Sequence, residues 1–212
     1  DAKRLAADDE IPNVEIYRRF EKQVKENIKE IQDTSFEKII FTTKDKVRLF
    51  GRYYHRQNGA PLVLMFHGYR SSALRDGMGA FKFTQECGYN LLMVDQRAHR
   101  QSGGRTITFG VKERYDCLEW IHYCRKRFGK DTKIILIGLS MGAATVLMAT
   151  GLELPQNVKG VIADCGYSTP KDILSSVIKK MQLPVEPVYQ IVRLSALLYG
   201  RFDPDKASAK EA

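Results

Sequence analysis

Short, continuous apolar runs alternate along this chain with longer segments in which apolar residues recur at helical spacing. The continuous runs cover residues 61–66, 90–95, 134–139 and 158–163. Runs of this kind are typical of strands buried on both faces of a parallel sheet. The segments between them predict helices over about 74–86, 111–128 and 141–152. Because strand and helix alternate, the pattern predicts an α/β fold with a doubly wound, mostly parallel sheet.

Different patterns flank this alternating region on its N-terminal side. Residues 36–42 and 47–54 predict two strands around a polar turn. Ahead of them, five apolar residues recur at helical spacing and predict an amphipathic helix over about 14–32: Ile16, Phe20, Val24, Ile28 and Ile31. We therefore divide the chain into an N-terminal helical extension, residues 1–35, and a core domain, residues 36–212. We expect the helix to pack on that domain.

A third pattern begins after Asp164, where two short amphipathic helices are predicted over about 173–181 and 188–198. Pro184 and Pro187 separate them. Helices inserted after a sheet strand predict a helical cap over residues 165–200, above the C-terminal ends of the strands. An ordinary pair of peripheral crossover helices is the alternative.

Length and charge exclude several classes of protein. At 212 residues the chain is long enough for one domain with a substantial core, and no apolar run approaches the ~20 residues that span a bilayer. It begins at Asp1 with neither Met nor a signal-peptide pattern, so membrane association would need an unseen upstream segment. The net charge is +9, but there is no nucleic-acid motif, and we expect a generally basic surface without a nucleic-acid partner.

Four cysteines are scattered through the chain: Cys87, Cys117, Cys124 and Cys165. They form no C-x-x-C pair and no cluster with histidine that has metal-ligand spacing. We interpret them as reduced, buried thiols of a cytoplasmic protein, and we expect no metal site. Cys117 and Cys124 are seven residues apart, which places both on one face of a predicted helix.

The stretch Gly138-Leu139-Ser140-Met141-Gly142 lies between a predicted strand and a predicted helix. In this setting G-x-S-x-G indicates a nucleophile elbow, a tight turn that exposes the serine at the end of a strand. Glycines on either side let strand and helix pass close together. Ser140 is therefore the candidate nucleophile. A glycine-rich turn with a buried, inert serine is the alternative.

Two further motifs precede the elbow. His67-Gly68-Tyr69-Arg70-Ser71-Ser72 follows one predicted strand, and the loop over 95–104 follows the next, with the sequence DQRAHRQSGG. With the elbow, they resemble, in the same order, the motifs of the α/β-hydrolase superfamily, especially bacterial esterase-like members of uncharacterised substrate. The resemblance covers residue 36 to the end. Ala98 and Arg100 stand where the family pattern D-x-R-G-H-G-x-S-x-G has glycine.

The resemblance implies a carboxylesterase-like serine hydrolase that cleaves an ester, thioester or related acyl bond of a small molecule through an acyl-enzyme, without a cofactor. Ser140 Oγ would attack, and the backbone N–H of Met141 would donate to the oxyanion. The resemblance assigns the second oxyanion donor to the N–H of Tyr69. It also gives His67 and His99 a role in supporting loops rather than in proton transfer.

A general base is not evident in these 212 residues. In this fold the acid and then the histidine follow the nucleophile, whereas His55, His67, His99 and His122 all precede Ser140. We expect the acid and histidine to lie in C-terminal strands absent from this chain, which alone would be inactive. A non-catalytic, hydrolase-like binding or scaffold protein is the alternative. Asp164, at a strand end, is a further candidate acid.

Arginines gather in or near the loops that follow the strands, at Arg70, Arg75, Arg97, Arg100 and Arg105. They suggest a mouth that favours anionic substrates. Surface arginines with solvated head groups are the alternative.

Overall fold

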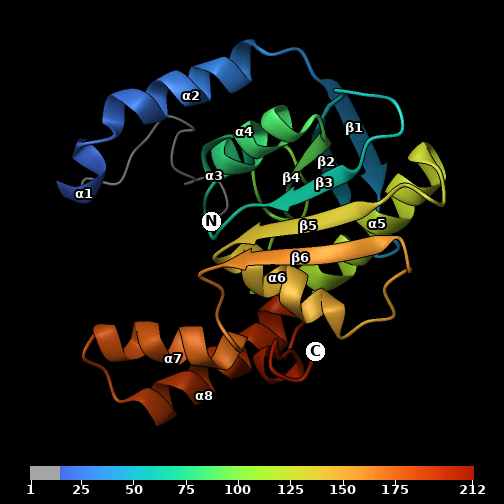
Figure 1. Cartoon of the computed structure of the whole chain (residues 1–212). Coiled ribbons are helices and arrows are strands. Elements are labelled where there is room, and N and C mark those ends of the chain that lie inside the picture. Colours follow the sequence, from blue (N-terminus) through green and yellow to red (C-terminus); the bar gives the residue numbers. More distant parts are fainter. Residues whose placement is uncertain (1–14) are drawn as a thin grey trace.

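The computed structural model describes residues 15–212 and contains one six-stranded sheet (Figure 1). Its strands are β1 (Glu37–Thr42), β2 (Arg48–Tyr54), β3 (Leu62–Phe66), β4 (Asn90–Asp95), β5 (Ile134–Leu139) and β6 (Val158–Asp164). They lie in the order β1-β2-β4-β3-β5-β6. β2 runs antiparallel to β1 and β4, and the other neighbouring pairs are parallel. The mostly parallel sheet predicted from the apolar runs is confirmed.

Helices cover both faces of the sheet (Figure 1). α5 (Glu113–Phe128) and α6 (Met141–Thr150) lie on one face, while α2 (Glu21–Asp33), α3 (Ala73–Asp76) and α4 (Met78–Cys87) lie on the other. β3 shows how one strand serves both layers. Leu64 and Phe66 pack into the core that contains Trp120, whereas Val63 and Met65 pack into the opposite core. A strand buried on both faces needs a continuous apolar run, which is why such runs in the sequence predicted these strands.

The N-terminal helix differs in detail from its prediction. A short helix, α1 (Glu15–Arg18), is separated by a turn from α2, and Val14 lies outside the described residues. Ile28 and Ile31 are buried where α2 packs beside α3 and α4. Phe20 is 59% exposed, so its prediction as part of the packed face is wrong. Within α2, the buried apolar residues lie in the C-terminal half of the helix.

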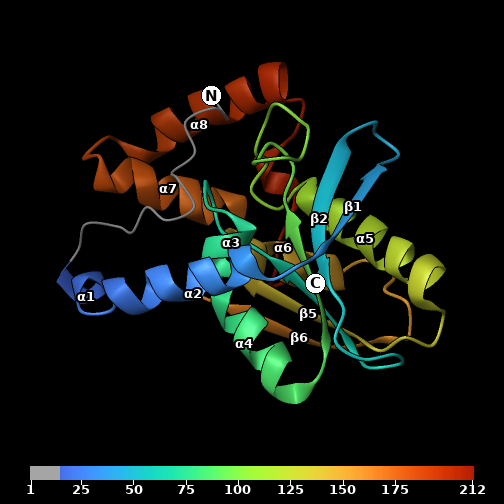
Figure 2. The same cartoon turned by 90° about the horizontal axis from the view of Figure 1, so that it is seen from above.

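Two helices follow β6, as predicted: α7 (Pro170–Lys180) and α8 (Val185–Ser195), which runs on into a π-helical turn, Ala196–Gly200. Pro187 lies within α8 rather than between the helices, in the first turn, where a missing N–H breaks no bond. The α7–α8 hairpin and α2 lie on the same side of the molecule, toward which β5 and β6 end (Figures 1 and 2). That the hairpin caps the strand ends stays a prediction.

A short turn after the hairpin anchors α8. Arg193 donates two hydrogen bonds of 2.9 Å to the carboxylate of Asp203, and the hydroxyl of Tyr189 donates to Asp205. The N–H of Ala209 reaches back to the carbonyl of Ser168 at 2.8 Å. These contacts fix the root of the hairpin to the segment that follows it.

The cysteines only partly match their prediction. Cys117 and Cys124 are buried together in the face of α5 that packs on the sheet. Cys87 and Cys165 are exposed, because each lies at the end of an element and outside the apolar layers. All four thiols are free. In the described part of the chain, no helix is both long and apolar enough to cross a membrane.

Three backbone segments meet at the junction of β5 and α6. A Cβ added to Gly142 would collide with the carbonyl group of Phe66 at the end of β3, and one added to Gly138 would collide with the backbone of Gly142. No flexible side chain is available to move aside. Only glycine therefore fits at these two positions, and their spacing in the sequence reflects the close passage of strand and helix.

We expect Gly142→Ala to lower the free energy of unfolding by about 1–3 kcal/mol or more, because the added methyl group meets backbone that cannot relax. Gly79→Ala is the matched control, since Gly79 lies in α4 and a Cβ there meets nothing within 4 Å. That change should leave stability unchanged or raise it by up to ~1 kcal/mol. Urea unfolding measures both. Equal changes in the free energy of unfolding for the two variants would contradict the close packing described at Gly142.

Candidate active site

Ser140 lies at the C-terminal end of β5 and immediately precedes α6. Its φ is 53° and its ψ is −111°, an uncommon backbone conformation for any residue other than glycine. The turn is held on both sides, because Ser140 N–H donates to the carbonyl of Asp164 at 2.8 Å and Ser140 C=O accepts from Ala144 at 3.0 Å. Strain of this kind persists where neighbouring structure imposes it, and it is concentrated at functional sites.

The loop after β3 lies directly against Ser140. A Cβ added to Gly68 would be 3.4 Å from Cβ of Ser140. The loop is anchored by Asp76 of α3, whose carboxylate accepts from the N–H of Gly68 at 2.7 Å and from the hydroxyl of Ser71 at 2.6 Å. The backbone of residues 68 and 69 is thereby held next to the serine.

His67 supports this loop through both ring nitrogens. Nε2 accepts from the N–H of Gln96 at 3.0 Å, so Nδ1 carries the proton and donates to the carbonyl of Gly68 at 2.8 Å. Burial lowers the pKa of His67 to about 3, and the ring is neutral. With both nitrogens engaged by backbone, His67 is not available as a general base.

His99 acts in the same way from the loop after β4. Its Nε2 accepts from the N–H of Arg70 at 3.0 Å and its Nδ1 donates to the carbonyl of Arg97 at 2.8 Å. Burial also lowers the pKa of His99. The two rings meet edge to face, with centroids 4.7 Å apart. A pair of neutral imidazoles therefore holds the backbone on both sides of Tyr69.

The two sequence-predicted oxyanion donors lie on elements that flank Ser140. Met141 is the first residue of α6, so its N–H is among the four amides of a helix start that have no intrahelical partner. Tyr69 follows Gly68, and the amides on its two sides are engaged by Asp76 and His99. Both N–H groups thus belong to backbone that other contacts fix in place.

Gln96 is a site residue that sequence reasoning missed. It is 3% exposed, its side-chain amide donates to the carbonyl of His67, and its Oε1 accepts from Thr145 of α6 at 3.1 Å. It connects the helix after the serine to the loop beside the serine. The sequence signal that could have identified Gln96 is its position as a polar residue just after the buried strand β4.

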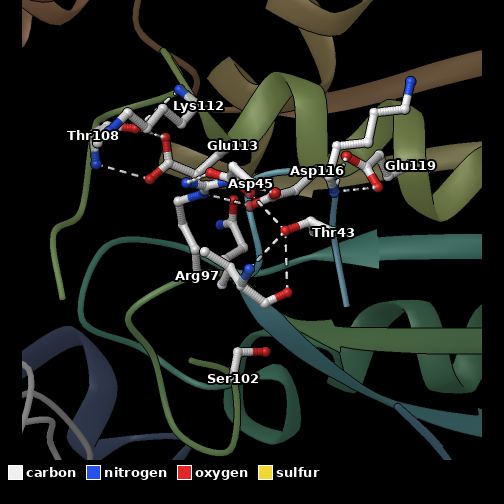
Figure 3. Close-up of polar contacts among 12 residues, drawn as sticks. Thr43, Asp45, Arg97, Ser102, Thr108, Lys112, Glu113, Asp116 and Glu119 are labelled. Atoms are coloured by element: carbon white, nitrogen blue, oxygen red, sulfur yellow. Dashed lines mark hydrogen bonds and ion pairs between the residues drawn. The ribbon is translucent and has the colours of Figure 1, made fainter. Parts of the chain in front are cut away.

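Arg97 is buried and lies at the centre of an ion network in which Asp116 is also buried and Asp45 is half-exposed (Figure 3). Its Nε and Nη2 each donate to Asp116 of α5 at 2.6 Å, and its Nη1 donates to Asp45 at 2.9 Å. The prediction that Arg97 contributes to a basic mouth is therefore wrong, because its guanidinium is buried and paired with two carboxylates. Neither aspartate was singled out by sequence, since each lies on an element distant along the chain.

The loop after β4 has a positive φ at both positions where the family pattern has glycine. Ala98 has a φ of 59° and Arg100 a φ of 45°, in the region that favours glycine. Ala98 N–H donates to Gly103 at 2.7 Å, and Gly103 N–H donates to Arg48 of β2 at 2.6 Å. The loop thus keeps its shape at a cost in strain, held by hydrogen bonds to itself and to the sheet.

No hydrogen bond joins Ser140 to any of the four histidines, all of which lie in the described part of the chain. His55 is paired with the hydroxyl of Tyr53 at 3.1 Å, and His122 is exposed on α5. Asp164 is exposed, and its contact with Ser140 is through its backbone carbonyl. Within residues 15–212, no group of three or more His, Cys, Asp or Glu side chains could hold a metal ion.

A family model described as the alpha/beta hydrolase fold matches residues 61–191, more than half of the chain. The chain belongs to the alpha/beta-hydrolase family. The match includes the loop at His67, the loop at Arg97 and the turn at Ser140. The elements that meet around this serine are therefore those of a hydrolase fold.

Individual relatives are more distant and longer. The chain is 26% identical over 141 residues to YqkD, an uncharacterised protein of Bacillus subtilis, covering 66% of the chain and 46% of that protein. It is 26% identical over 140 residues to the thiohydrolase aneE of Aspergillus aculeatus, covering 65% and 43%. The chain thus spans less than half the length of these curated relatives.

Solved structures of esterases share the fold. A Pyrococcus furiosus esterase superposes with a TM-score of 0.60 and 27% identity, over 77% of this chain and 62% of the esterase. The Penicillium alpha/beta hydrolase GrgF has a TM-score of 0.56 over 79% of this chain and 56% of its own, and at 19% identity it supports the fold alone.

The ion network predicts a large loss when Arg97 is removed. Arg97→Met leaves the carboxylate of Asp116 buried and unpaired, and we expect a loss of about 3–5 kcal/mol in the free energy of unfolding. Arg97→Met combined with Asp116→Leu should cost less. Arg127→Met is the control, because the Arg127–Glu37 pair is half-exposed and should be worth under ~1 kcal/mol. Chemical denaturation that gives equal losses for both single variants would contradict the network's importance.

The neutral state of His67 predicts acid sensitivity. The unfolded chain binds a proton here below pH 6.5, whereas the folded protein does not until about pH 3. The free energy of unfolding should therefore fall with decreasing pH across this window, with about 1.4 kcal/mol per pH unit due to His67. His67→Gln should lack that slope, and His122→Gln, at an exposed site, should retain it. Parallel pH profiles for wild type and His67→Gln would refute the assignment.

Proposed function

We propose that the full-length protein is a serine hydrolase that cleaves an ester, thioester or related acyl bond of a small molecule, with Ser140 as the nucleophile. The observation that carries the proposal is the strained backbone of Ser140 between β5 and α6, with the anchored loop of Gly68 and Tyr69 against it. This geometry suits a hydroxyl that attacks a carbonyl carbon beside fixed backbone donors.

In this mechanism Ser140 Oγ forms a bond to the acyl carbon as a base takes its proton, and the carbonyl oxygen becomes an oxyanion. The N–H groups of Tyr69 and Met141 stabilise that oxyanion, each typically worth about 3 kcal/mol in the transition state. On collapse the bond to the leaving group breaks, and the base returns its proton so that an alcohol or thiol departs. Water then hydrolyses the acyl-enzyme, which releases the acid and restores Ser140. The proposed reaction requires no cofactor.

The proposal assigns the base and its acid partner to a segment that follows residue 212 in the full-length protein. His67 and His99 are excluded as bases because backbone groups engage both nitrogens of each ring. The esterase and thiohydrolase among the similar proteins support acyl-transfer chemistry for the family. A non-catalytic binding protein is the second candidate, favoured by the absence of a base bonded to Ser140 in the described residues.

Labelling of the full-length protein with a fluorophosphonate distinguishes the two candidates, because this reagent reacts with an activated serine. We expect stoichiometric labelling that Ser140→Ala abolishes. Ser176→Ala is the matched control, since Ser176 is exposed on α7, and it should leave labelling unchanged. An unlabelled full-length protein, or labelling that persists in Ser140→Ala, would reject the serine hydrolase and leave the binding protein.

A further inference from the structure

Phe109 has a left-handed backbone with a φ of 54°, and Gly110 after it has a φ of 97°. An aromatic residue is costly in this region, where asparagine and glycine are the usual occupants. Glycine suits position 110 because L side chains rarely adopt this φ, and an added Cβ would also lie 2.6 Å from the sulfur of the Met148 side chain. The conformation of Phe109 therefore needs support from outside the residue.

A buried carboxylate supplies that support. Glu113 of α5 is 1% exposed and accepts from the N–H of Thr108 at 2.8 Å, the hydroxyl of Thr108 at 2.5 Å and the N–H of Gly110 at 2.8 Å. These partners stand on both sides of Phe109, as Figure 3 shows for Thr108 and Glu113. Glu113 thus clamps the turn that presents the Phe109 ring.

The clamped ring stacks on Tyr69. The two centroids are 5.4 Å apart and the planes are inclined by 22°. Tyr69 is 48% exposed and directly follows Gly68, where an added Cβ would lie 3.4 Å from the Cβ of Ser140. The aromatic pair is therefore one residue from the closest approach of this loop to the serine, and it remains accessible to a bound molecule.

The same segment also reaches the end of the α7–α8 hairpin. Lys112 Nζ donates to the carbonyl of Gly200 at 3.2 Å, and a Cβ on Gly200 would lie 3.4 Å from the methyl group of Thr106. The segment that carries Phe109 thus contacts the last turn of the hairpin, while Phe109 itself stacks on the loop beside Ser140.

We propose that Phe109 is a specificity-determining residue whose ring, with that of Tyr69, forms an aromatic wall of the substrate site. The wall would favour substrates with a flat, apolar group next to the reacting carbonyl, such as aryl or conjugated acyl groups. Stacked rings present a π surface that a planar group matches better than a puckered aliphatic one. This inference rests on the proposed function for its reaction but concerns binding alone.

The test measures binding of two amides with the same carbon skeleton, cinnamamide and 3-cyclohexylpropanamide, to full-length Ser140→Ala by isothermal titration calorimetry. We expect cinnamamide to bind about five-fold more tightly. Adding Phe109→Leu, which keeps bulk but removes the ring, should bring that ratio close to one, whereas Phe109→Tyr should preserve it. Phe83→Leu is the matched control, because Phe83 lies on α4 and pairs with Tyr89, outside these loops, and the change should leave the ratio unchanged.

Equal binding of the two amides by full-length Ser140→Ala would by itself contradict the proposed aromatic wall. A preference that survives Phe109→Leu would overturn it as well. Because the measurement uses no nucleophile, a preference lost in Phe109→Leu together with absent fluorophosphonate labelling would reject the hydrolase and retain the wall.

Discussion

The structure depends on the close approach of three backbone segments where β5 turns into α6. Gly142 passes so near the carbonyl of Phe66 that no side chain fits, and Gly138 passes equally near Gly142. This contact brings the ends of β3 and β5 together and fixes the start of α6 between them. The strained conformation of Ser140 follows from the geometry, because the chain must reverse within one residue.

Polar side chains around that contact hold loops rather than perform proton transfer. Gln96 connects α6 to His67, and His67 and His99 connect two loops through neutral rings. Arg97 ties the second loop to α5 through Asp116. Rigid support of this kind suits a site in which backbone N–H groups must be in place before charge develops. The buried charges and the neutral histidines therefore serve the same end, which is a preorganised backbone.

Much of the fold was predictable because its information is local. Strands buried on both faces require continuous apolar runs, and the elbow requires glycines at fixed spacing, so β3 to β6 and Ser140 could be read from the chain. Gln96 and Asp116 were missed because their partners lie on elements distant in sequence. Glu113 was missed although its partners Thr108 and Gly110 are local, because they lie in a loop whose conformation periodicity does not predict. The break between α1 and α2 was missed for a related reason: periodicity does not say where the supporting surface ends.

The same limit explains why Arg97 was placed wrongly. Arg97 looks like its neighbours in the sequence, and only the tertiary position of Asp45 and Asp116 shows that it points into the protein. Ala98 and Arg100, in contrast, have the positive φ that favours glycine, at the two positions where the family pattern has glycine.

The central claim is that Ser140 stands beside two fixed backbone donors. A crystal structure of the full-length protein with a phosphonate adduct on Ser140 tests it most directly, because the phosphonyl oxygen imitates the oxyanion. The account predicts that this oxygen lies about 2.7–3.1 Å from the N atoms of both Tyr69 and Met141. An adduct whose oxygen points away from both amides, or an adduct on another residue, would contradict it.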